Sequence, residues 1–244
     1  MKIIAGNWKM NKTKEDAKAF FEEYKALVKQ TDNKVIVCAP FTVVKTVAKQ
    51  KKKNDINVIA GAQNVHPAKN GAFTGEISVD MLKSMDCGAV IIGHSERRTM
   101  FLETDEFINE KVKATIDAGM IAIFCIGETL EEREHNQTFE VLMTQINKGL
   151  NGVTNSENLY VAYEPVWAIG TGKVATTEQI QETHAFIKEL VTKQFGVDVP
   201  VLYGGSANEQ NCSEIFAIQG VDGALIGGAS LVASKFAAMA NYQA

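Results

Sequence analysis

Three residues with chemically versatile side chains each stand just after a short apolar run of the sequence. Lys9 closely follows the run 3–5, His94 follows 89–92, and Glu164 directly follows 159–163. A carboxylate can take a proton from carbon, while an imidazole and an ammonium group can stabilise the negative charge that forms on oxygen. Taken singly, each has an ordinary alternative, since Lys9 or Glu164 could be a surface charge and His94 a hydrogen-bonded core residue. Their joint placement favours a catalytic site.

Glycine-rich turns follow the last two apolar runs. Gly204, Gly205 and Ser206 come after the run 199–203, and Gly227 and Gly228 come after 223–226. Backbone N–H groups in such turns, together with a helix N-terminus, can hold a phosphate dianion. A phosphate site after the last two strands recurs in α/β barrels. Plain turns are the alternative, but the paired placement predicts phosphate binding.

Signals for metal or nucleophilic chemistry are weak. The four histidines show no H-x-x-x-H or H-E-x-x-H spacing, and the H-x-E at His94 lacks the P-C-x-x-C partner of zinc deaminases. The sequence has no G-x-S-x-G elbow. Cys125 ends an apolar run, which favours a packed thiol, and we expect all four cysteines to be buried and free. We therefore expect no metal and no cofactor.

Eight short runs rich in β-branched residues alternate with longer amphipathic stretches. The runs lack the apolar–polar alternation of a half-exposed strand, which predicts parallel strands buried on both faces. They occupy 3–5, 35–38, 56–60, 89–92, 121–125, 159–163, 199–203 and 223–226. Further helices are expected near 43–53, 79–85, 104–118, 138–149, 177–194, 208–217 and 231–240.

The first helix is expected to begin after Thr13, because Thr13 and Asp16 have the spacing of a capping box. Its apolar face comprises Ala17, Phe20, Phe21, Tyr24, Leu27 and Val28. The lysine cluster at 49–53 is interpreted as the solvated end of the second helix, where the helix dipole favours cations, rather than as a nucleic-acid patch.

This order of elements allows an open doubly wound sheet or a closed barrel. The missing G-x-G-x-x-G after the first run weakens the open sheet, and strand number and length favour an α/β fold of the (β/α)₈ TIM-barrel type. The 244 residues fit one such domain, 1–244. The net charge of −4 gives no reason to expect nucleic acid or a membrane as partner. No run resembles a signal peptide or a membrane span, so a cytoplasmic protein is expected.

Five motifs spread along the chain are similar to those of the triosephosphate isomerase family. They are GNWKMN at 6–11, GHSERR at 93–98, AYEPVWAIGTGK at 162–173, YGGS at 203–206 and GGASL at 227–231. The stretch 162–173 is the most specific. The resemblance implies a cofactor-free interconversion of dihydroxyacetone phosphate and D-glyceraldehyde 3-phosphate through an enediol(ate), a step of glycolysis and gluconeogenesis.

The resemblance also implies a role for each matched catalytic residue. Glu164 would be the base that moves the proton between C1 and C2, and His94 the electrophile that polarises the carbonyl. Lys9, beside Asn7, would stabilise negative charge on the substrate and intermediate, with Glu96 as an acid behind them. A short helical turn after His94 would depress its pKa and keep the imidazole neutral, an effect that is known for this family.

The same resemblance implies how the rest of the substrate is held. Asn7 and Lys9 would also contact the substrate. Its phosphate would be held by backbone N–H groups of Gly170, Ser206 and Gly228, with Gly227 beside it. A lid would close over the substrate, with a hinge at each end. Its residues would be Val166, Trp167, Ala168, Ile169, Gly170, Thr171, Gly172, Lys173, Val174, Ala175 and Thr176.

The family is usually a homodimer, which implies that the loop 63–76 docks into a partner subunit. By that analogy Thr74 would reach toward residues 7–9 of the partner, with Arg97 supporting the contact. The sequence departs from the family pattern at Ala207, where valine is common, and at Lys188, where arginine usually pairs with an acid near Asp222. Lysine cannot form a bidentate pair, so this ion pair is expected to be weaker.

Two rival functions use the same fold. An aldolase, or another phosphosugar isomerase, would keep the barrel and the phosphate site, but an aldolase needs a Schiff-base lysine inside a strand. None of the eight runs carries an interior lysine. A non-catalytic binding scaffold would be expected to lose the base or the lid, and this sequence keeps the motifs for both.

Overall fold

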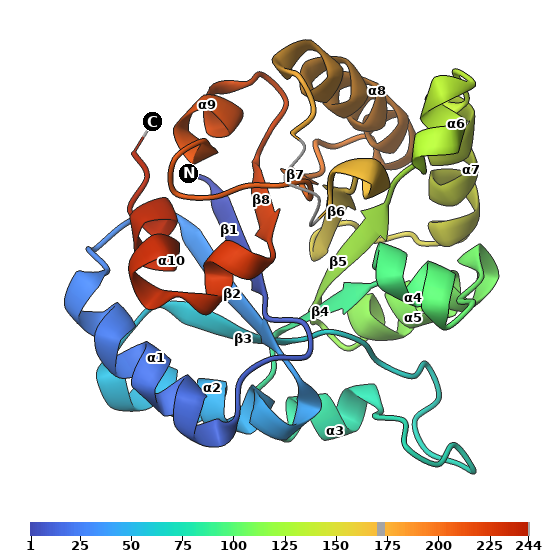
Figure 1. Ribbon diagram of the computed structural model, residues 1–244. Coiled ribbons are helices and arrows are strands. Elements are labelled where there is room, and N and C mark those ends of the chain that lie inside the picture. The colour runs from blue at the N-terminus through green and yellow to red at the C-terminus, as the bar shows by residue number, and fades with distance from the viewer. Residues whose placement is uncertain (170–173, 244) are drawn as a thin grey trace.

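Eight parallel strands form a closed barrel in the computed structural model, which describes residues 1–169 and 174–243 (Figure 1). Each strand pairs with the next one along the chain, and β8 closes the barrel against β1. The strands are β1 Ile3–Asn7, β2 Lys34–Ala39, β3 Val58–Ala62, β4 Ala89–Ile92, β5 Ile121–Ile126, β6 Leu159–Tyr163, β7 Val201–Tyr203 and β8 Gly223–Ile226. The predicted (β/α)₈ barrel is confirmed.

Helices surround the barrel (Figure 1). They are α1 Lys14–Leu27, α2 Phe41–Asn54, α3 Val79–Lys83, α4 Ser95–Met100, α5 Asp105–Asp117, α6 Leu130–Glu134, α7 Thr138–Gly149, α8 Thr177–Phe195, α9 Cys212–Ala217 and α10 Ala233–Ala240. Two 3₁₀ helices, η1 Val166–Ala168 and η2 Gly228–Leu231, follow β6 and β8. Among the described helices, none is long and apolar enough to cross a membrane.

Successive strand residues point alternately into two separate cores. On β1, Ile3 and Ala5 belong to the core inside the barrel, whereas Ile4 packs in the layer between strands and helices. Every residue of β4, β5 and β6 is buried. The expectation of two buried faces is therefore confirmed. The inner core consists of Ile3, Ala5, Ile36, Cys38, Ala89, Ile91, Ile121, Ile123, Cys125, Tyr160, Ala162, Leu202 and Leu225.

The start of α1 agrees with the prediction, but its end does not. The Thr13 side chain accepts the Asp16 N–H, and the Asp16 carboxylate accepts the Thr13 N–H at 2.8 Å, which completes the capping box. The apolar face through Tyr24 is buried. The placement of Leu27 on that face is wrong, since it is the last residue of α1 and its side chain is exposed. The lysine cluster 49–53 ends α2 as predicted.

Several elements begin later than the periodicity predicts, each for a local reason. β3 begins two residues late, because Asp55 takes a left-handed conformation (φ 52°) at the end of α2. β7 begins after Pro200, which has no N–H to give to a neighbouring strand. α9 begins four residues late, because the Asn208 side chain accepts the N–H groups of Gln210 and Asn211.

The short helix α6 was not predicted at all. It has no buried residue, so no apolar periodicity marks it, although Thr129 and Glu132 form a capping box. All four cysteines are buried and free, as expected. Burial raises the pKa of the Cys125 thiol well above its usual range, which agrees with a packed rather than a reactive thiol.

Candidate active site

A cavity of about 480 Å³ lies at the rim formed by the C-terminal ends of the strands. β1 brings Asn7 and Lys9 to it, the loop after β4 brings His94, and the loop after β6 brings Glu164. The turns after β7 and β8 supply the remaining wall, which is lined by Gly204, Gly205, Ser206, Ala207, Asn208, Gly227, Gly228 and Ala229. The cavity therefore brings together the side chains and the glycine turns that the sequence singled out.

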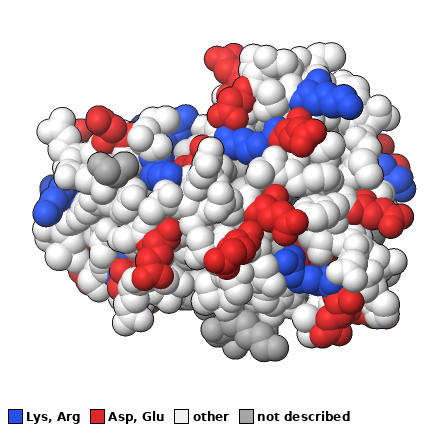
Figure 2. Space-filling model, turned by 90° about the horizontal axis from the view of Figure 1, so that it is seen from above, with Lys and Arg blue, Asp and Glu red and all other residues white. Residues whose placement is uncertain are grey.

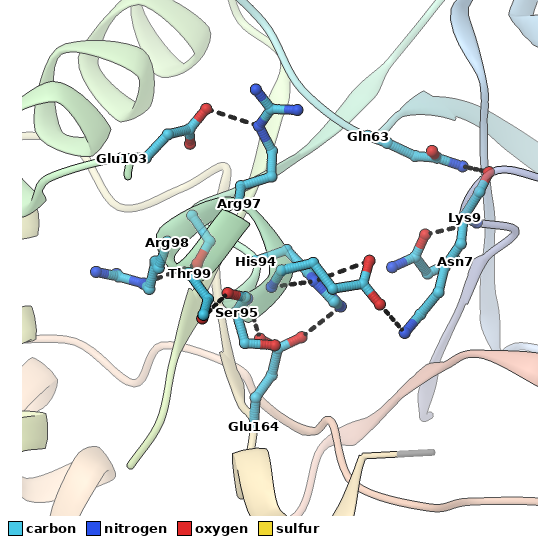
Figure 3. Close-up of polar contacts among 12 residues, drawn as sticks. Asn7, Lys9, Gln63, His94, Ser95, Arg97, Arg98, Thr99, Glu103 and Glu164 are labelled. Carbon is cyan, nitrogen blue, oxygen red and sulfur yellow. Dashed lines mark hydrogen bonds and ion pairs between the residues drawn. The ribbon is translucent and has the colours of Figure 1, made fainter. Parts of the chain in front are cut away.

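Glu164 is a buried carboxylate held by two donors (Figure 3). Its Oε2 accepts the backbone N–H of Ser95 at 2.9 Å, and its Oε1 lies 2.9 Å from Nε2 of His94. Burial raises the pKa of Glu164, but the charge and hydrogen bond of His94 and the Ser95 N–H outweigh burial, so that the net direction is down. Glu164 is thus kept ionised in a nearly dry site.

Two glycines fix the backbone around Glu164. Tyr163 pairs with Ile126 on one side and with Tyr203 on the other, so Glu164 follows between Gly127 and Gly204. A Cβ on Gly127 would lie 1.7 Å from the Glu164 carbonyl oxygen. A Cβ on Gly204 would lie 2.8 Å from Cγ of Glu164. Only glycine therefore lets these two loops approach the base so closely.

His94 is the N-cap residue of α4 and is nearly buried. Its Nδ1 accepts the N–H of Glu96 at 3.2 Å, which assigns the remaining ring hydrogen to Nε2, the nitrogen that faces Glu164. The expected depression of the His94 pKa is wrong for this arrangement. Burial is the largest single influence and lowers the pKa, but the charge and hydrogen bond of Glu164, together with the charge of Glu96, outweigh it, so that the net direction is up.

Lys9 occupies a strained backbone position opposite this pair. Its φ is 49°, which is uncommon for a residue with a side chain. The conformation is supported from two sides, because its N–H donates to Oδ1 of Asn7 at 3.0 Å and its carbonyl accepts Nε2 of Gln63 at 2.9 Å. Its Nζ lies 2.5 Å from Oε1 of Glu96. The ammonium group is thereby directed toward the cavity.

The other end of the cavity is made largely of backbone. Ser206, Gly227 and Gly228 line it as predicted, whereas Gly170 lies outside the described residues. A Cβ on Gly228 would meet nothing within 4 Å, so its backbone faces open space. The Trp8 indole N–H donates to the Ser230 carbonyl at 3.0 Å and so ties the loop after β1 to the turn after β8.

The predicted lid is described at both of its ends, while Gly170, Thr171, Gly172 and Lys173 lie outside the described residues. The first part forms η1, and the side-chain N–H of Trp167 donates to Oε1 of Glu128 at 3.0 Å. Glu128 is fully buried and also accepts the Tyr163 hydroxyl at 3.1 Å and Arg133 at 3.0 Å. At the far end, Thr176 caps α8 through a capping box. Ile169 and Val174 line the cavity.

Three residues that hold the site together did not emerge from the sequence. Ser95 acts through its backbone N–H, which no residue type can signal. Gln63 and Glu128 are ordinary polar residues until the fold brings Lys9 and Trp167 to them. For Ser95, the only signal was its place beside His94 at the end of an apolar run.

The two residues predicted at a dimer contact differ in exposure, since the side chain of Arg97 is only 23% exposed. Thr74 is exposed in the loop after β3, and Nε of Arg97 donates to Oε1 of Glu103 at 2.6 Å.

The departure at Lys188 leaves an ion pair in place, since Nζ lies 2.7 Å from both Asp198 and Asp222. Within 1–169 and 174–243, no group of three or more His, Cys, Asp or Glu side chains is arranged to hold a metal ion.

Fold and site together define a (β/α)₈-barrel enzyme. The chain matches the family model described as triosephosphate isomerase over residues 2–243. It is 50% identical over 249 aligned residues to a triosephosphate isomerase of Geobacter metallireducens, with 99% of this chain and 98% of the relative covered. Relatives of the same name from Syntrophotalea carbinolica and Alkaliphilus oremlandii are 49% and 47% identical, with at least 98% of each chain covered. The chain belongs to the triosephosphate isomerase family.

Proposed function

We propose that this chain interconverts dihydroxyacetone phosphate and D-glyceraldehyde 3-phosphate, with Glu164 as the base that carries the proton between C1 and C2. The observation that carries the proposal is the buried Glu164 carboxylate, 2.9 Å from Nε2 of His94, in one cavity with Lys9 and the glycine turns. Membership of the family supports this reaction. The cavity has the groups that it needs, a base, two hydrogen-bond donors and a backbone wall that can bind an anion.

The chemistry needs Glu164 to leave its present partners. Its Oε2 accepts the Ser95 N–H and its Oε1 faces Nε2 of His94, so neither oxygen is free to take a proton from carbon. When the substrate enters, the carboxylate turns from Ser95 toward carbon, and positioned proton transfer of this kind contributes about 10²–10⁴-fold to the rate.

Two donors then meet the oxygens of the developing enediolate. Once Glu164 has turned toward carbon, its charge and hydrogen bond no longer raise the pKa of His94, while burial still lowers it. His94 then offers Nε2–H as a neutral imidazole whose Nδ1 accepts the Glu96 N–H. Lys9 offers its ammonium group, which exchanges Glu96 for the substrate oxygen. A preorganised donor in a dry site is worth roughly 3–4 kcal/mol of transition-state stabilisation.

The phosphate binds at the backbone wall, on the N–H groups of Ser206 and Gly228 beside Gly227, with Gly170 of the lid as a further donor. Closure of the lid 166–176 over the phosphate excludes water and keeps the enediolate from expelling its phosphate. Deletion of 169–172 should therefore raise the share of methylglyoxal among the products. An unchanged product ratio, measured by trapping methylglyoxal, would contradict this role of the lid.

The chain works as a single barrel domain, 1–244, and as a cytoplasmic homodimer. The loop after β3 projects away from the barrel (Figure 1), as a docking loop would. Large apolar side chains are exposed at Met10, Phe73, Met100, Phe101 and Leu102, where a partner would cover them.

The dimer proposal has its own test. Thr74→Arg should lower both the dimer fraction in sedimentation and the activity, because the loop would no longer support Lys9 of the partner. Full activity of a monomer at high dilution would argue against this coupling.

A coupled assay with D-glyceraldehyde 3-phosphate tests the reaction and the base together. Glu164→Asp withdraws the carboxylate by one methylene and should lower kcat by about 10²-fold or more, with little change in inorganic-phosphate binding. Glu157→Asp, at an exposed loop residue, is the matched control and should leave kcat unchanged. Full turnover in Glu164→Asp would remove Glu164 from its role, and a wild-type chain without activity would refute the proposed reaction.

The aldolase alternative finds little support in the cavity. Among the described strands the only lysine is Lys34, the first residue of β2, and its Nζ donates to the Tyr160 hydroxyl at 2.6 Å. It lies at the N-terminal end of the strand, opposite the rim that holds the cavity.

A further inference from the structure

The phosphate end of the cavity carries a cation that the proposed mechanism does not use. Lys235, in the first turn of α10, lines the same cavity as Ser206 and Gly228. Its Nζ lies 2.9 Å from Oε1 of Glu209, in the loop after β7. The ion pair thus ties the start of α10 to the loop after β7.

Helix stability does not account for a lysine at this place. A cation in the first turn opposes the helix dipole, which favours acidic residues there. The first turn of α10 has no acidic residue and no side-chain cap to offset that charge. The ion pair with Glu209 is partly exposed, with side-chain exposures of 47% and 24%, and exposed pairs of this kind contribute little to folding stability.

The charges around the cavity suggest a role for Lys235 in attracting an anion. Among the described residues that line it, the charged side chains are Lys9, Glu164 and Lys235. Glu164 repels a dianion, and the ammonium group of Lys9 is engaged by Glu96 at the reacting end. Lys235 is the other cation of this set; it is also paired, with Glu209, but its side chain is half-exposed and it lies beside the backbone wall rather than at the reacting end.

We propose that Lys235 attracts the phosphate dianion of the substrate to the backbone wall of the cavity, and that Glu209 holds its ammonium group at the rim while the cavity is empty. The identity of the anion as a phosphorylated triose rests on the proposed function. When the dianion arrives, Lys235 exchanges one anionic partner for another. The attraction acts over about 10 Å at 0.1 M salt and weakens as ionic strength rises.

The experiment compares three variants in kcat/KM for D-glyceraldehyde 3-phosphate at ionic strengths from about 0.02 to 0.5 M. Lys235→Gln removes the cation, and Glu209→Gln removes its counter-charge. Lys52→Gln is the control, because Lys52 also forms an exposed ion pair, with Asp86 at 2.7 Å, and the same unit of net charge is lost. Lys52 lies near the end of α2 and does not line the cavity.

At the lowest salt, Lys235→Gln should lower kcat/KM about 3- to 10-fold, with kcat nearly unchanged, and the deficit should shrink at high salt. Glu209→Gln should raise kcat/KM about 2-fold at low salt, and Lys52→Gln should match the wild type. If Lys235→Gln matches Lys52→Gln at every ionic strength, the proposal is wrong. A parallel loss in both Lys235→Gln and Glu209→Gln that does not depend on salt would mean a purely structural tether and would also overturn it.

Binding of inorganic phosphate, measured by calorimetry, separates this proposal from the proposed reaction. Lys235→Gln should weaken phosphate binding at low salt whether or not the enzyme isomerises trioses. A chain without isomerase activity whose phosphate affinity still depends on Lys235 would refute the reaction and retain the anion site. An active enzyme whose phosphate affinity is unchanged in Lys235→Gln would support the reaction and refute the anion site.

Discussion

The two ends of the cavity differ in the groups that line them, which are side chains at one end and mainly backbone at the other. At the reacting end, the side chains of Glu164 and His94 are nearly buried and contact each other at 2.9 Å. At the phosphate end, Ser206, Gly227 and Gly228 line the cavity with backbone, and the charged side chain beside them, Lys235, is half-exposed. Side chains that must transfer a proton need a fixed, dry setting, whereas a dianion can be held by N–H groups whose positions the fold already sets. Substitutions at the two ends should therefore fail in different ways.

The largest effect is expected at the reacting end, from His94→Ala. The substitution removes the proton donor at the carbonyl and should lower kcat by about 10²–10³-fold. Loss of the N-cap of α4 should also cost about 1 kcal/mol of folding free energy, which thermal denaturation can measure. Calorimetry should find inorganic-phosphate binding unchanged. Equal losses of kcat and phosphate affinity would contradict the view that the two ends of the cavity act separately.

A pair of glycine substitutions sharpens the same comparison. Gly204→Ala should destabilise the fold by about 1–3 kcal/mol and lower kcat, because its Cβ would lie 2.8 Å from Cγ of Glu164 and 2.9 Å from the Tyr163 carbonyl oxygen. Gly228→Ala should change stability by less than about 0.5 kcal/mol, since its Cβ would meet nothing within 4 Å, and should mainly raise KM. Denaturant unfolding with steady-state kinetics measures both. The comparison fails if the stabilities of the two variants are equal.

The smallest effect is a change in one proton equilibrium. In the wild type, the negative charge of Glu164 raises the pKa of His94 against the lowering effect of burial. In Glu164→Gln that charge is gone and burial remains, so the pKa of His94 should fall below its value in the wild type. Titration of the His94 ring by NMR measures the direction. A pKa that stays or rises would show that the two groups are not coupled as the geometry indicates.

The difference between the two ends also explains what could be predicted from the sequence. Lys9, His94 and Glu164 were identified because polar side chains after apolar runs stand out, and the barrel brings them into one cavity. Ser95 and Gln63 were missed, because the first works through its backbone and the second through a contact made only in the fold. The reversed shift of the His94 pKa was also missed, since it depends on where the Glu164 carboxylate lies.

The fold was predictable where burial alone decides it. Strands with both faces buried appear as continuous apolar runs, and all eight were located. The observed starts of β3, β7 and α9 differ from the predicted ones because local backbone conformation or hydrogen bonding at Asp55, Pro200 and Asn208 prevents an earlier start. The unpredicted α6 buries no residue that could mark it. Burial patterns thus located the elements, while loop hydrogen bonds determined where some of them begin.

A crystal structure with a phosphorylated two-carbon carboxylate, which imitates the enediolate, tests the central role of Glu164 most directly. The Glu164 carboxylate is expected to leave the Ser95 N–H and to lie within hydrogen-bond reach, about 2.6–3.2 Å, of the part of the inhibitor that stands for the reacting carbons. His94 and Lys9 should then face its oxygens. A carboxylate that stays on Ser95, out of contact with the bound inhibitor while the lid is closed, would contradict this role of Glu164.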